Sequence, residues 1–371
     1  MKMLSIKPSI DLYGSCKEFA ETLQINENDL VISNKYIYEP FFGSMGLKCK
    51  VLYQEEYGVG EPSDEMAEKL YADMKGGSYK RIIAIGGGTI IDIAKLYALK
   101  NVSPILDLYD RKLELIKDKE LILVPTTCGT GSEVTNISIL ELKSRHTKMG
   151  LAADELYADS AAMIPELLDG LPFKFFATSS VDALIHAYES FLSPKSSPYT
   201  EIFAKEAIEL ILRGYMEIAK NGEEARKPLL KEFLIASNYA GIAFGNAGVG
   251  AVHAMSYPLG GTYHVPHGEA NYALFVGVCK AYQKRNPTGK ITVVNKIICD
   301  ILGCKEDVVY EELEKLLNKI LQRKPLREYG VTDADIKDFT ENVMTKQGRL
   351  TANNYVPLDA AAVEAIYREL Y

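Results

Sequence analysis

The chain has 371 residues, of which 47% are hydrophobic and 25% charged, and its formal net charge is -8 at pH 7. This composition is ordinary for a globular protein, and roughly 150 residues per domain predicts about two domains. A negative chain without a long basic tract lacks the footprint of a nucleic-acid or anionic-membrane binder. With no secretion signal and no run of about 18 apolar residues, we expect a cytoplasmic protein whose cysteines are reduced.

The first half of the chain alternates short apolar runs with helix-like stretches. Residues 29–32, 50–53, 81–85 and 121–124 read as short strands. The run at 81–85 is continuously apolar rather than alternating, which favours a strand buried on both faces of a parallel sheet. A helix is predicted over 90–99, between the last two strands. Strand, helix and strand at this spacing are typical of an α/β domain.

The second half has a different periodicity. From about Leu171 onward, apolar residues recur at three and four positions, as in Val181, Leu184, Ile185 and Tyr188. This spacing predicts helices, and a glycine and a proline just around Leu171 mark the boundary. We therefore predict an α/β domain over residues 1–171 followed by an all-helical domain over residues 172–371.

A glycine-rich loop follows the strand at 81–85. Gly86, Gly87, Gly88 and Thr89 precede the predicted helix. Glycines allow the backbone to approach a ligand closely, and free amides at a helix start favour phosphate. The loop lacks the GxGxxG fingerprint, and a tight strand-to-helix turn explains its glycines equally well.

A second loop, residues 125–133, follows the strand at 121–124. It supplies hydroxyls and glycines at the carboxyl end of the sheet, where doubly wound folds bind ligands. A helix cap by Ser132 or Thr130 is an alternative, and both readings can hold together. Two such loops in one sheet favour a dinucleotide site. Cys128 has no evident partner base and is interpreted as a packing residue.

The second half contains a candidate metal site. Asp182 and His186 are four residues apart and would share one face of a helix. His253 and His267 follow, separated by prolines and glycines that predict His253 at the end of one helix and His267 at the start of the next. One carboxylate and three imidazoles suit Fe, Zn or Co. From the residues alone, buried hydrogen-bonded histidines remain an alternative.

Together these motifs resemble the iron-containing (group III) alcohol dehydrogenase family. The resemblance covers nearly the whole chain, in family order, through RIIAIGGGTIIDIAK, ELILVPTTCGTGSEVTN, LLDGLPFKFFATSSVDALIHAYESFLSP and GNAGVGAVHAMSYPLGGTYHVPHGEANY. It implies the fold shared with dehydroquinate synthases, in which an α/β domain carries a parallel dinucleotide-binding sheet and an all-helical domain binds metal and substrate. It also implies a homodimer or larger assembly.

The resemblance assigns roles by position in this sequence. It implies that Asp182, His186, His253 and His267 bind the metal, which is Fe(II) or, in some members, Zn. The residues that it implies for the nicotinamide cofactor are Gly87, Gly88, Thr89, Asp92, Thr126, Thr127, Thr130, Lys148 and Asn34.

Two positions depart from the family pattern. Tyr257 stands where many members carry a second histidine, four residues after the third metal ligand, so His264 is the nearest candidate for a proton carrier. Asn34 stands where many members carry an aspartate that disfavours the 2′-phosphate of NADP. NAD is expected from the resemblance, and NADP is not excluded.

Within the family, the chain is most similar to members that interconvert 4-hydroxybutyrate and succinate semialdehyde. The expected reaction moves a hydride between this pair and NAD(H) while the metal polarises the alcohol or aldehyde oxygen. His267, His264 and Tyr257 are the candidate catalytic residues. Alternatives are a dehydrogenase of the same family for 1,3-propanediol or butanol, a dehydroquinate synthase-like lyase, and a non-enzymatic sensor. Candidate groups for a substrate carboxylate are Lys143, Arg145, Tyr257 and Tyr263.

Overall fold

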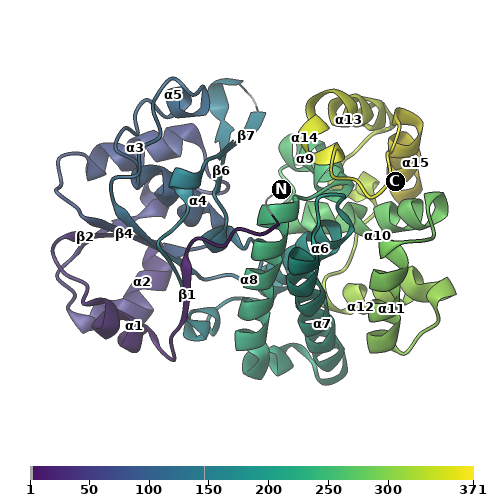
Figure 1. Cartoon of the computed structure of the whole chain (residues 1–371), viewed down its shortest axis with the longest axis horizontal. Helices are drawn as coiled ribbons and strands as arrows, with labels where there is room; N and C mark the ends of the chain where they lie inside the picture. The colour runs from purple at the N-terminus through teal and green to yellow at the C-terminus, as the bar shows by residue number, and fades with distance from the viewer. Residues whose placement is uncertain (1–2, 146) are drawn as a thin grey trace. The chain divides into compact units, whose positions relative to one another are not determined.

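The computed structural model describes residues 3–145 and 147–371. The chain forms two compact units, Ile6–Leu171 and Pro172–Tyr371, and residues 3–5 belong with the second of them (Figure 1). The backbone N–H of Ser5 donates to Asn246 Oδ1 over 2.7 Å, and Asn246 Nδ2 donates to the Ser5 carbonyl over 3.0 Å. These bonds explain why the first described residues accompany the helical unit, rather than the α/β domain to which the sequence pattern assigns them.

A six-stranded parallel sheet in the order β1-β8-β5-β4-β2-β3 forms the centre of the first unit. The central strands β2, β4 and β5 are buried almost throughout, which confirms the α/β prediction. Since β3 and β4 lie on opposite sides of β2, the strand order reverses between β2 and β4, where doubly wound sheets bind ligands. The strands are β1 (Ser9–Leu12), β2 (Asp29–Ser33), β3 (Lys50–Tyr53), β4 (Arg81–Gly86), β5 (Glu120–Pro125) and β8 (Ser160–Met163).

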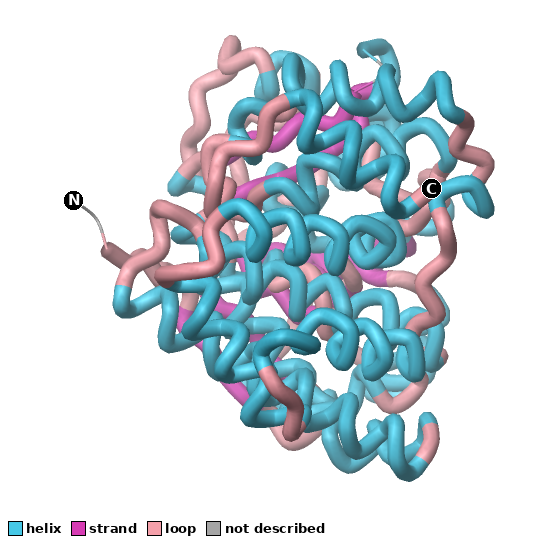
Figure 2. The backbone as a smooth tube through the Cα atoms, turned by 90° about the vertical axis from the view of Figure 1, so that its right-hand side faces the viewer, coloured by secondary structure: helices cyan, strands magenta, loops and turns pink. Residues whose placement is uncertain are grey.

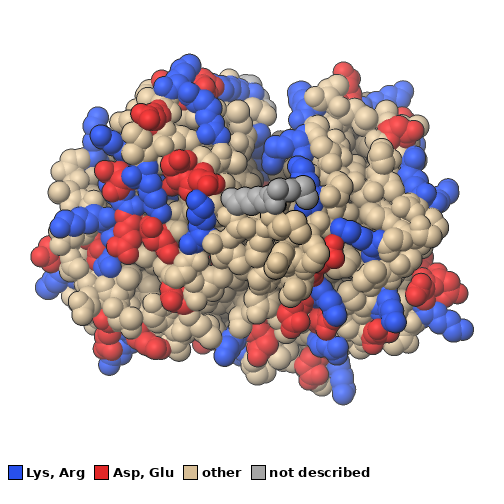
Figure 3. Space-filling model, in the orientation of Figure 1, with Lys and Arg blue, Asp and Glu red and all other residues tan. Residues whose placement is uncertain are grey.

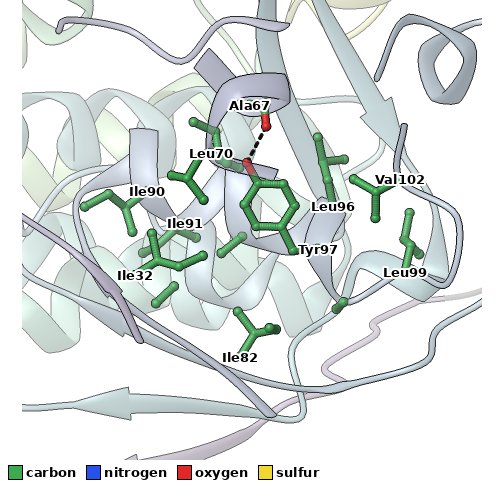
Figure 4. Close-up of a cluster of buried hydrophobic side chains, with 14 of the residues drawn as sticks. Ile32, Ala67, Leu70, Ile82, Ile90, Ile91, Leu96, Tyr97, Leu99 and Val102 are labelled. Atoms are coloured by element: carbon green, nitrogen blue, oxygen red, sulfur yellow. Dashed lines mark hydrogen bonds between the residues drawn. The ribbon is translucent and has the colours of Figure 1, made fainter. Parts of the chain in front are cut away.

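A large apolar core lies within this unit. Tyr97 and Leu70 lie among isoleucines from the strands, such as Ile32 and Ile82, and the Tyr97 hydroxyl donates to the Ala67 carbonyl over 2.7 Å (Figure 4). The phenol is therefore buried with its one polar atom satisfied. The helices of the unit are α1 (Cys16–Leu23), α2 (Lys35–Phe42), α3 (Asp64–Met74), α4 (Gly88–Tyr97) and α5 (Ile105–Tyr109).

An antiparallel hairpin, β6 (Ile137–Leu142) and β7 (Thr147–Ala152), completes the unit and was not predicted. In β6 the side chains alternate between partly and fully buried, the period-two pattern of a half-buried strand. The loop after β5 continues into β6 through a single 3-10 turn, Ser132–Val134, whose N-cap is Gly131. The alternative interpretation of Ser132 or Thr130 as the cap of an α-helix is therefore wrong, because no α-helix lies between this loop and β6 in the described residues.

The second unit consists of helices and their connections in the described residues, which confirms the prediction for this half (Figure 2). The long helix α6 packs against α7, α8 and α10, and from Ser180 to its end every residue is buried. The helices are α6 (Phe173–Leu192), α7 (Pro198–Asn221), α8 (Leu230–Ala247), α9 (Ala251–Tyr263), α10 (His267–Arg285), α11 (Lys290–Leu302), α12 (Val309–Ile320), α13 (Asp333–Lys346), α14 (Gly348–Thr351) and α15 (Ala360–Leu370).

The prediction that His253 ends a helix is wrong. His253 lies in the first turn of α9, which continues through Pro258 to Tyr263. The chain turns before the histidine instead, at Gly248, whose φ of 78° is in the left-handed region that glycine tolerates. Pro258 and Leu259 are buried, so tertiary packing overrides the helix-breaking tendency of proline here.

The surface mixes charges of both signs. On the face drawn in Figure 3, lysine and arginine side chains are interspersed with aspartate and glutamate. Among the described residues, no helix is both long and apolar enough to cross a membrane.

Candidate functional site

One carboxylate and three imidazoles converge in the helical unit. Asp182 and His186 are one turn apart on α6, His253 comes from α9, and His267 is the first residue of α10. One ligand atom from each of the four lies within 4.8 Å of the others. The Nε2 atoms of His253 and His267 are each 3.8 Å from Asp182 Oδ1. The first three side chains are buried, and that of His267 is 36% exposed, so the cluster is accessible at His267.

A glycine allows α10 to approach α6 this closely. A Cβ atom at Gly268 would lie 2.2 Å from the backbone oxygen of Thr178, which is far inside van der Waals contact. Thr178 is one turn before Asp182 on α6. The absence of a side chain at Gly268 therefore lets the start of α10 bring His267 against the carboxylate.

The electrostatics of the cluster favour an ionised carboxylate. Burial alone would raise the pKa of Asp182, but the surrounding imidazoles and a hydrogen bond from Asn271 lower it below its usual value. A buried carboxylate is stable only when charged or hydrogen-bonding partners surround it. The cluster thus supplies one anionic oxygen and three nitrogen donors in a largely dry environment.

The hydrogen bonds of Asn271 indicate whether a metal fits this donor set. Its Nδ2 donates to Asp182 Oδ1 over 2.7 Å and also lies 3.1 Å from His253 Nε2 and 3.2 Å from His267 Nε2. Asn271 is fully buried, yet its Oδ1 has no hydrogen-bond partner among the described residues. One NH₂ group has two hydrogens for three acceptors. The surplus of converging lone pairs, from nitrogen and carboxylate donors, fits a divalent transition metal.

The two candidate proton carriers lie differently. The ring of Tyr257 is 6.1 Å from the ring of His267, centroid to centroid. His264 is an exposed residue at the C-cap of α9, with a left-handed φ of 53°, and lies outside the four-residue cluster. The structure therefore places the Tyr257 ring beside a residue of the cluster, whereas His264 is not one of the four clustered residues.

The two predicted cofactor loops lie side by side in the α/β unit. Parallel pairing of β4 with β5 places Gly86 opposite Pro125, so both loops leave the same edge of the sheet. A Cβ atom at Gly88 would lie 3.0 Å from Thr130 Cγ2, and one at Gly87 would lie 3.5 Å from Thr127 Cγ2. These glycines open α4, where first-turn amides favour a phosphate, and Thr126 follows β5 in the second loop.

A buried lysine that sequence reasoning missed joins α4 to the second loop and to the start of β6. Lys95 Nζ, fully buried on α4, lies 2.6 Å from Ser132 Oγ, 3.1 Å from Thr135 Oγ1 and 2.7 Å from the Ile137 carbonyl oxygen. Burial lowers the pKa of Lys95, and the nearby Asp92 partly opposes that shift. The signal in the sequence is a lysine three residues after an aspartate within the largely apolar segment IIDIAKLY.

The contacts of Asp92 are with other residues of the α/β unit. Its Oδ2 accepts the Ile139 N–H over 3.0 Å, and its Oδ1 accepts a hydrogen bond from the Ser132 hydroxyl and lies 3.4 Å from Lys95 Nζ. The carboxylate therefore ties α4 to the second loop and to β6. The contacts of this carboxylate hold the second loop in place.

Asn34, the N-cap of α2 directly after β2, lies beside the carboxylate of Glu55, in the 3-10 turn that follows β3. Its Nδ2 donates to Glu55 Oε2 over 2.9 Å, and the Lys35 backbone N–H donates to Glu55 Oε1 over 2.7 Å. A negative charge thus lies next to Asn34 despite its neutral amide. Sequence reasoning missed Glu55 because it lies in the turn after β3, twenty-one residues later in the chain.

The remaining predicted polar residues have partners in the structure. Lys148, on β7, pairs with Glu61. The carbonyl of the preceding residue, Gly60, accepts a hydrogen bond from the Thr89 hydroxyl of the first loop. The segment formed by Gly60 and Glu61 therefore connects Lys148 to the first loop. The side groups suggested for a substrate carboxylate are also engaged: Lys143 pairs with Glu141, Arg145 with Asp110, and the Tyr263 hydroxyl donates to Asp335.

Curated relatives resemble the chain over its whole length. It is 51% identical over 371 residues to a 4-hydroxybutyrate dehydrogenase of Clostridium kluyveri, covering 100% of both chains. It is also 34% identical to long-chain-alcohol dehydrogenase 1 of Geobacillus thermodenitrificans, over 90% of this chain and 88% of the relative.

Solved structures share the fold. A 1,3-propanediol oxidoreductase superposes with a TM-score of 0.86 at 23% identity, covering 100% of both chains. A sulfoacetaldehyde reductase from Bifidobacterium kashiwanohense, solved in complex with NAD+, gives 0.86 at 22% identity, over 100% of this chain and 99% of the other.

Two family models match the chain in succession. Residues 13–165 match the model described as iron-containing alcohol dehydrogenase, and residues 176–371 match the C-terminal model of the same family. Together with the full-length relatives, these matches show that the chain belongs to the iron-containing alcohol dehydrogenase family.

Proposed function

We propose that this metal-dependent dehydrogenase interconverts 4-hydroxybutyrate and succinate semialdehyde, with NAD as the hydride carrier. The reaction type rests on the convergence of Asp182, His186, His253 and His267 in a family of metal-containing alcohol dehydrogenases. The substrate rests on the relative that is 51% identical along the entire chain.

The four clustered side chains would hold the metal, Fe(II) or Zn(II). A divalent cation bound there supplies Lewis acidity, which lowers the pKa of an alcohol and polarises a carbonyl. The ionised Asp182 provides the one negative charge among the donors, and the buried side chains exclude water around it. His267, the most exposed of the four, borders the side from which a substrate oxygen would arrive.

The paired loops at the carboxyl ends of β4 and β5 would bind the dinucleotide. The first-turn amides of α4, at Gly88 and Thr89, suit the pyrophosphate. Thr126, Thr127 and Thr130 add hydroxyls from the adjoining loop, and Lys95 with Asp92 holds the two loops in register. Lys148 lies close to the first loop through Glu61.

Glu55 supports NAD over NADP. Asn34 directly follows β2, at the reversal of strand order where an adenosine ribose would bind in a doubly wound sheet. The neighbouring Glu55 carboxylate would repel a 2′-phosphate while tolerating a 2′-hydroxyl. The charge thus comes from the turn after β3 instead of from the residue that follows β2.

Proton transfer would use either Tyr257 or His264. The Tyr257 ring is close to His267, whereas the exposed His264 could exchange protons with bulk water. The pH–rate profiles of Tyr257→Phe and His264→Ala would assign the role. The substitution that removes the group in the proton path should change the profile.

A homodimer or larger assembly in the cytoplasm completes the proposal. The strand β1 forms one edge of the sheet, and its Ile10 and Leu12 side chains are 43% and 49% exposed. Edge strands with exposed apolar side chains favour pairing with another chain. Light scattering on the purified protein tests the oligomeric state.

Metal dependence tests the proposed reaction. Protein freed of metal with a chelator and kept anaerobic should form no NADH from 4-hydroxybutyrate and NAD, and should regain activity with stoichiometric Fe(II) or Zn(II). Turnover without net NADH would indicate a lyase of the dehydroquinate synthase kind. Binding of metal and NAD without turnover of any alcohol would indicate a sensor.

A further inference from the structure

Glu189, one turn after His186 on α6, contacts the back of a candidate metal ligand. Its Oε2 lies 2.6 Å from His253 Nδ1, and each side chain is only 2% exposed. Asp182, His186 and Glu189 occupy positions i, i+4 and i+7 of α6, so all three lie on one helix face. The same face thus supplies two donors of the cluster and a carboxylate behind it.

The other oxygen of Glu189 is held by the backbone of the histidine's own helix. Glu189 Oε1 accepts the Val252 N–H over 2.7 Å, at the start of α9. Gly250, the N-cap of α9, has no side chain to accept this hydrogen bond, so Glu189 satisfies one of the free amides at the helix start. Two hydrogen bonds from consecutive residues leave the carboxylate, and the imidazole that it contacts, little freedom to rotate.

We propose that Glu189 is a positioning residue that keeps the proton of His253 on Nδ1 and its Nε2 lone pair directed at the metal. Both carboxylate oxygens then act as acceptors, one for the Val252 N–H and one for Nδ1–H. The opposite ring nitrogen, Nε2, lies on the side of the ring that faces Asp182 Oδ1. The inference rests on the proposed metal site and adds the residue that sets the tautomer and the orientation of one ligand.

The direct test compares Co(II) affinity in a double-mutant cycle. In Glu189→Gln, an amide replaces one acceptor oxygen with a donor, so Nδ1–H and the Val252 N–H can no longer both be accepted. We expect Co(II) binding, measured by competition with a chelator, to weaken about tenfold to a hundredfold, with a changed visible absorption spectrum of the bound ion.

His253→Gln supplies the background that isolates the mechanism. A glutamine side chain carries an amide oxygen at about the reach of Nε2 but has no counterpart of Nδ1. If Glu189 acts through His253, adding Glu189→Gln to this variant should change the Co(II) affinity less than about twofold. Equal weakening in both backgrounds, or unchanged affinity in the single variant, would overturn the proposal.

Glu269→Gln is the matched control. Glu269 is also a buried glutamate near a ligand, but it contacts Lys324 and Tyr329 instead of the cluster. Its variant should bind Co(II) as the wild type does. Failure of the wild type itself to bind Co(II) would contradict the proposed metal function together with this inference, whereas normal binding in Glu189→Gln contradicts this inference alone.

A measurement on the unmutated protein covers the case in which Glu189→Gln does not fold. Nitrogen-15 NMR of histidine-labelled, metal-free protein distinguishes the two neutral tautomers, and the signal lost in His253→Gln assigns the residue. The proposal predicts that His253 carries its proton on Nδ1. A proton on Nε2 would overturn it.

Discussion

Asn271 Nδ2 donates a hydrogen bond to Asp182 Oδ1 over 2.7 Å, which joins α10 to α6 at the centre of the donor cluster. The bond is buried, and the same nitrogen lies 3.1 Å from His253 Nε2 and 3.2 Å from His267 Nε2. In the metal-free protein, this amide adds to the surrounding imidazoles in compensating the buried carboxylate.

Replacement of Asn271 by alanine should therefore destabilise the metal-free protein more than the metal-loaded protein. Loss of the donor leaves a buried carboxylate oxygen under-compensated, at a cost of about 1–3 kcal/mol. A bound cation compensates the same oxygen. Urea unfolding with and without Zn(II) measures the difference, and equal destabilisation in the two states would contradict this role.

Replacement of His267 by alanine should remove metal binding and activity while leaving NAD binding intact. One of four donors is lost, whereas the predicted dinucleotide loops belong to the other compact unit. Metal analysis and NADH fluorescence titration measure the two properties separately. His264→Ala removes a neighbouring imidazole outside the cluster and should retain the metal; wild-type activity in His267→Ala would refute the ligand assignment.

Replacement of Lys95 by methionine should destabilise the α/β unit and weaken NAD binding. The substitution leaves Asp92, two hydroxyls and a carbonyl without their shared cation, and breaking a buried ion pair costs about 3–5 kcal/mol. Thermal unfolding and NAD titration test this expectation. Lys75→Met, at an exposed position of the same unit, should change stability by less than about 0.5 kcal/mol; similar effects of the two variants would argue against a bracing role for Lys95.

Replacement of Glu55 by glutamine should raise the use of NADP relative to NAD by about tenfold, the scale of one charge–charge interaction at a partly exposed site. The ratio of kcat/KM values for the two cofactors measures the effect. Glu56→Gln removes an exposed charge from the adjacent residue and should change the ratio much less. An unchanged ratio in Glu55→Gln would place the discrimination elsewhere.

The sequence predicted most strongly those features that local patterns encode. Buried strands such as residues 81–85 are continuous apolar runs, and the helical periodicity begins close to Leu171, so both halves could be classified. The short strand β8, with the sequence SAAM, has low β propensity, and its pairing with β1 and β5 depends on residues far away in the chain. No local pattern reveals such an element.

The candidate site shows the same division. The spacing of Asp182 and His186 is recognisable in the sequence as a helical pair. The role of Glu189 depends on its contact with His253 on α9, sixty-four residues later. Glu55 and Asn34 meet because β2 and β3 are neighbours in the sheet. The turn before His253 was misplaced because Pro258 and Gly260 normally interrupt helices, and only the packing of α9 explains their inclusion.

The most direct test of the proposed function is an anaerobic assay of the purified protein with Fe(II) and NAD, in which 4-hydroxybutyrate is compared with 1,3-propanediol and butanol while NADH absorbance is followed. A parallel series with NADP measures cofactor choice. We predict preferential NADH formation from 4-hydroxybutyrate, with succinate semialdehyde as the product. Equal or greater turnover of the uncharged alcohols would contradict recognition of a hydroxy acid and would indicate an alcohol or diol dehydrogenase of the same family.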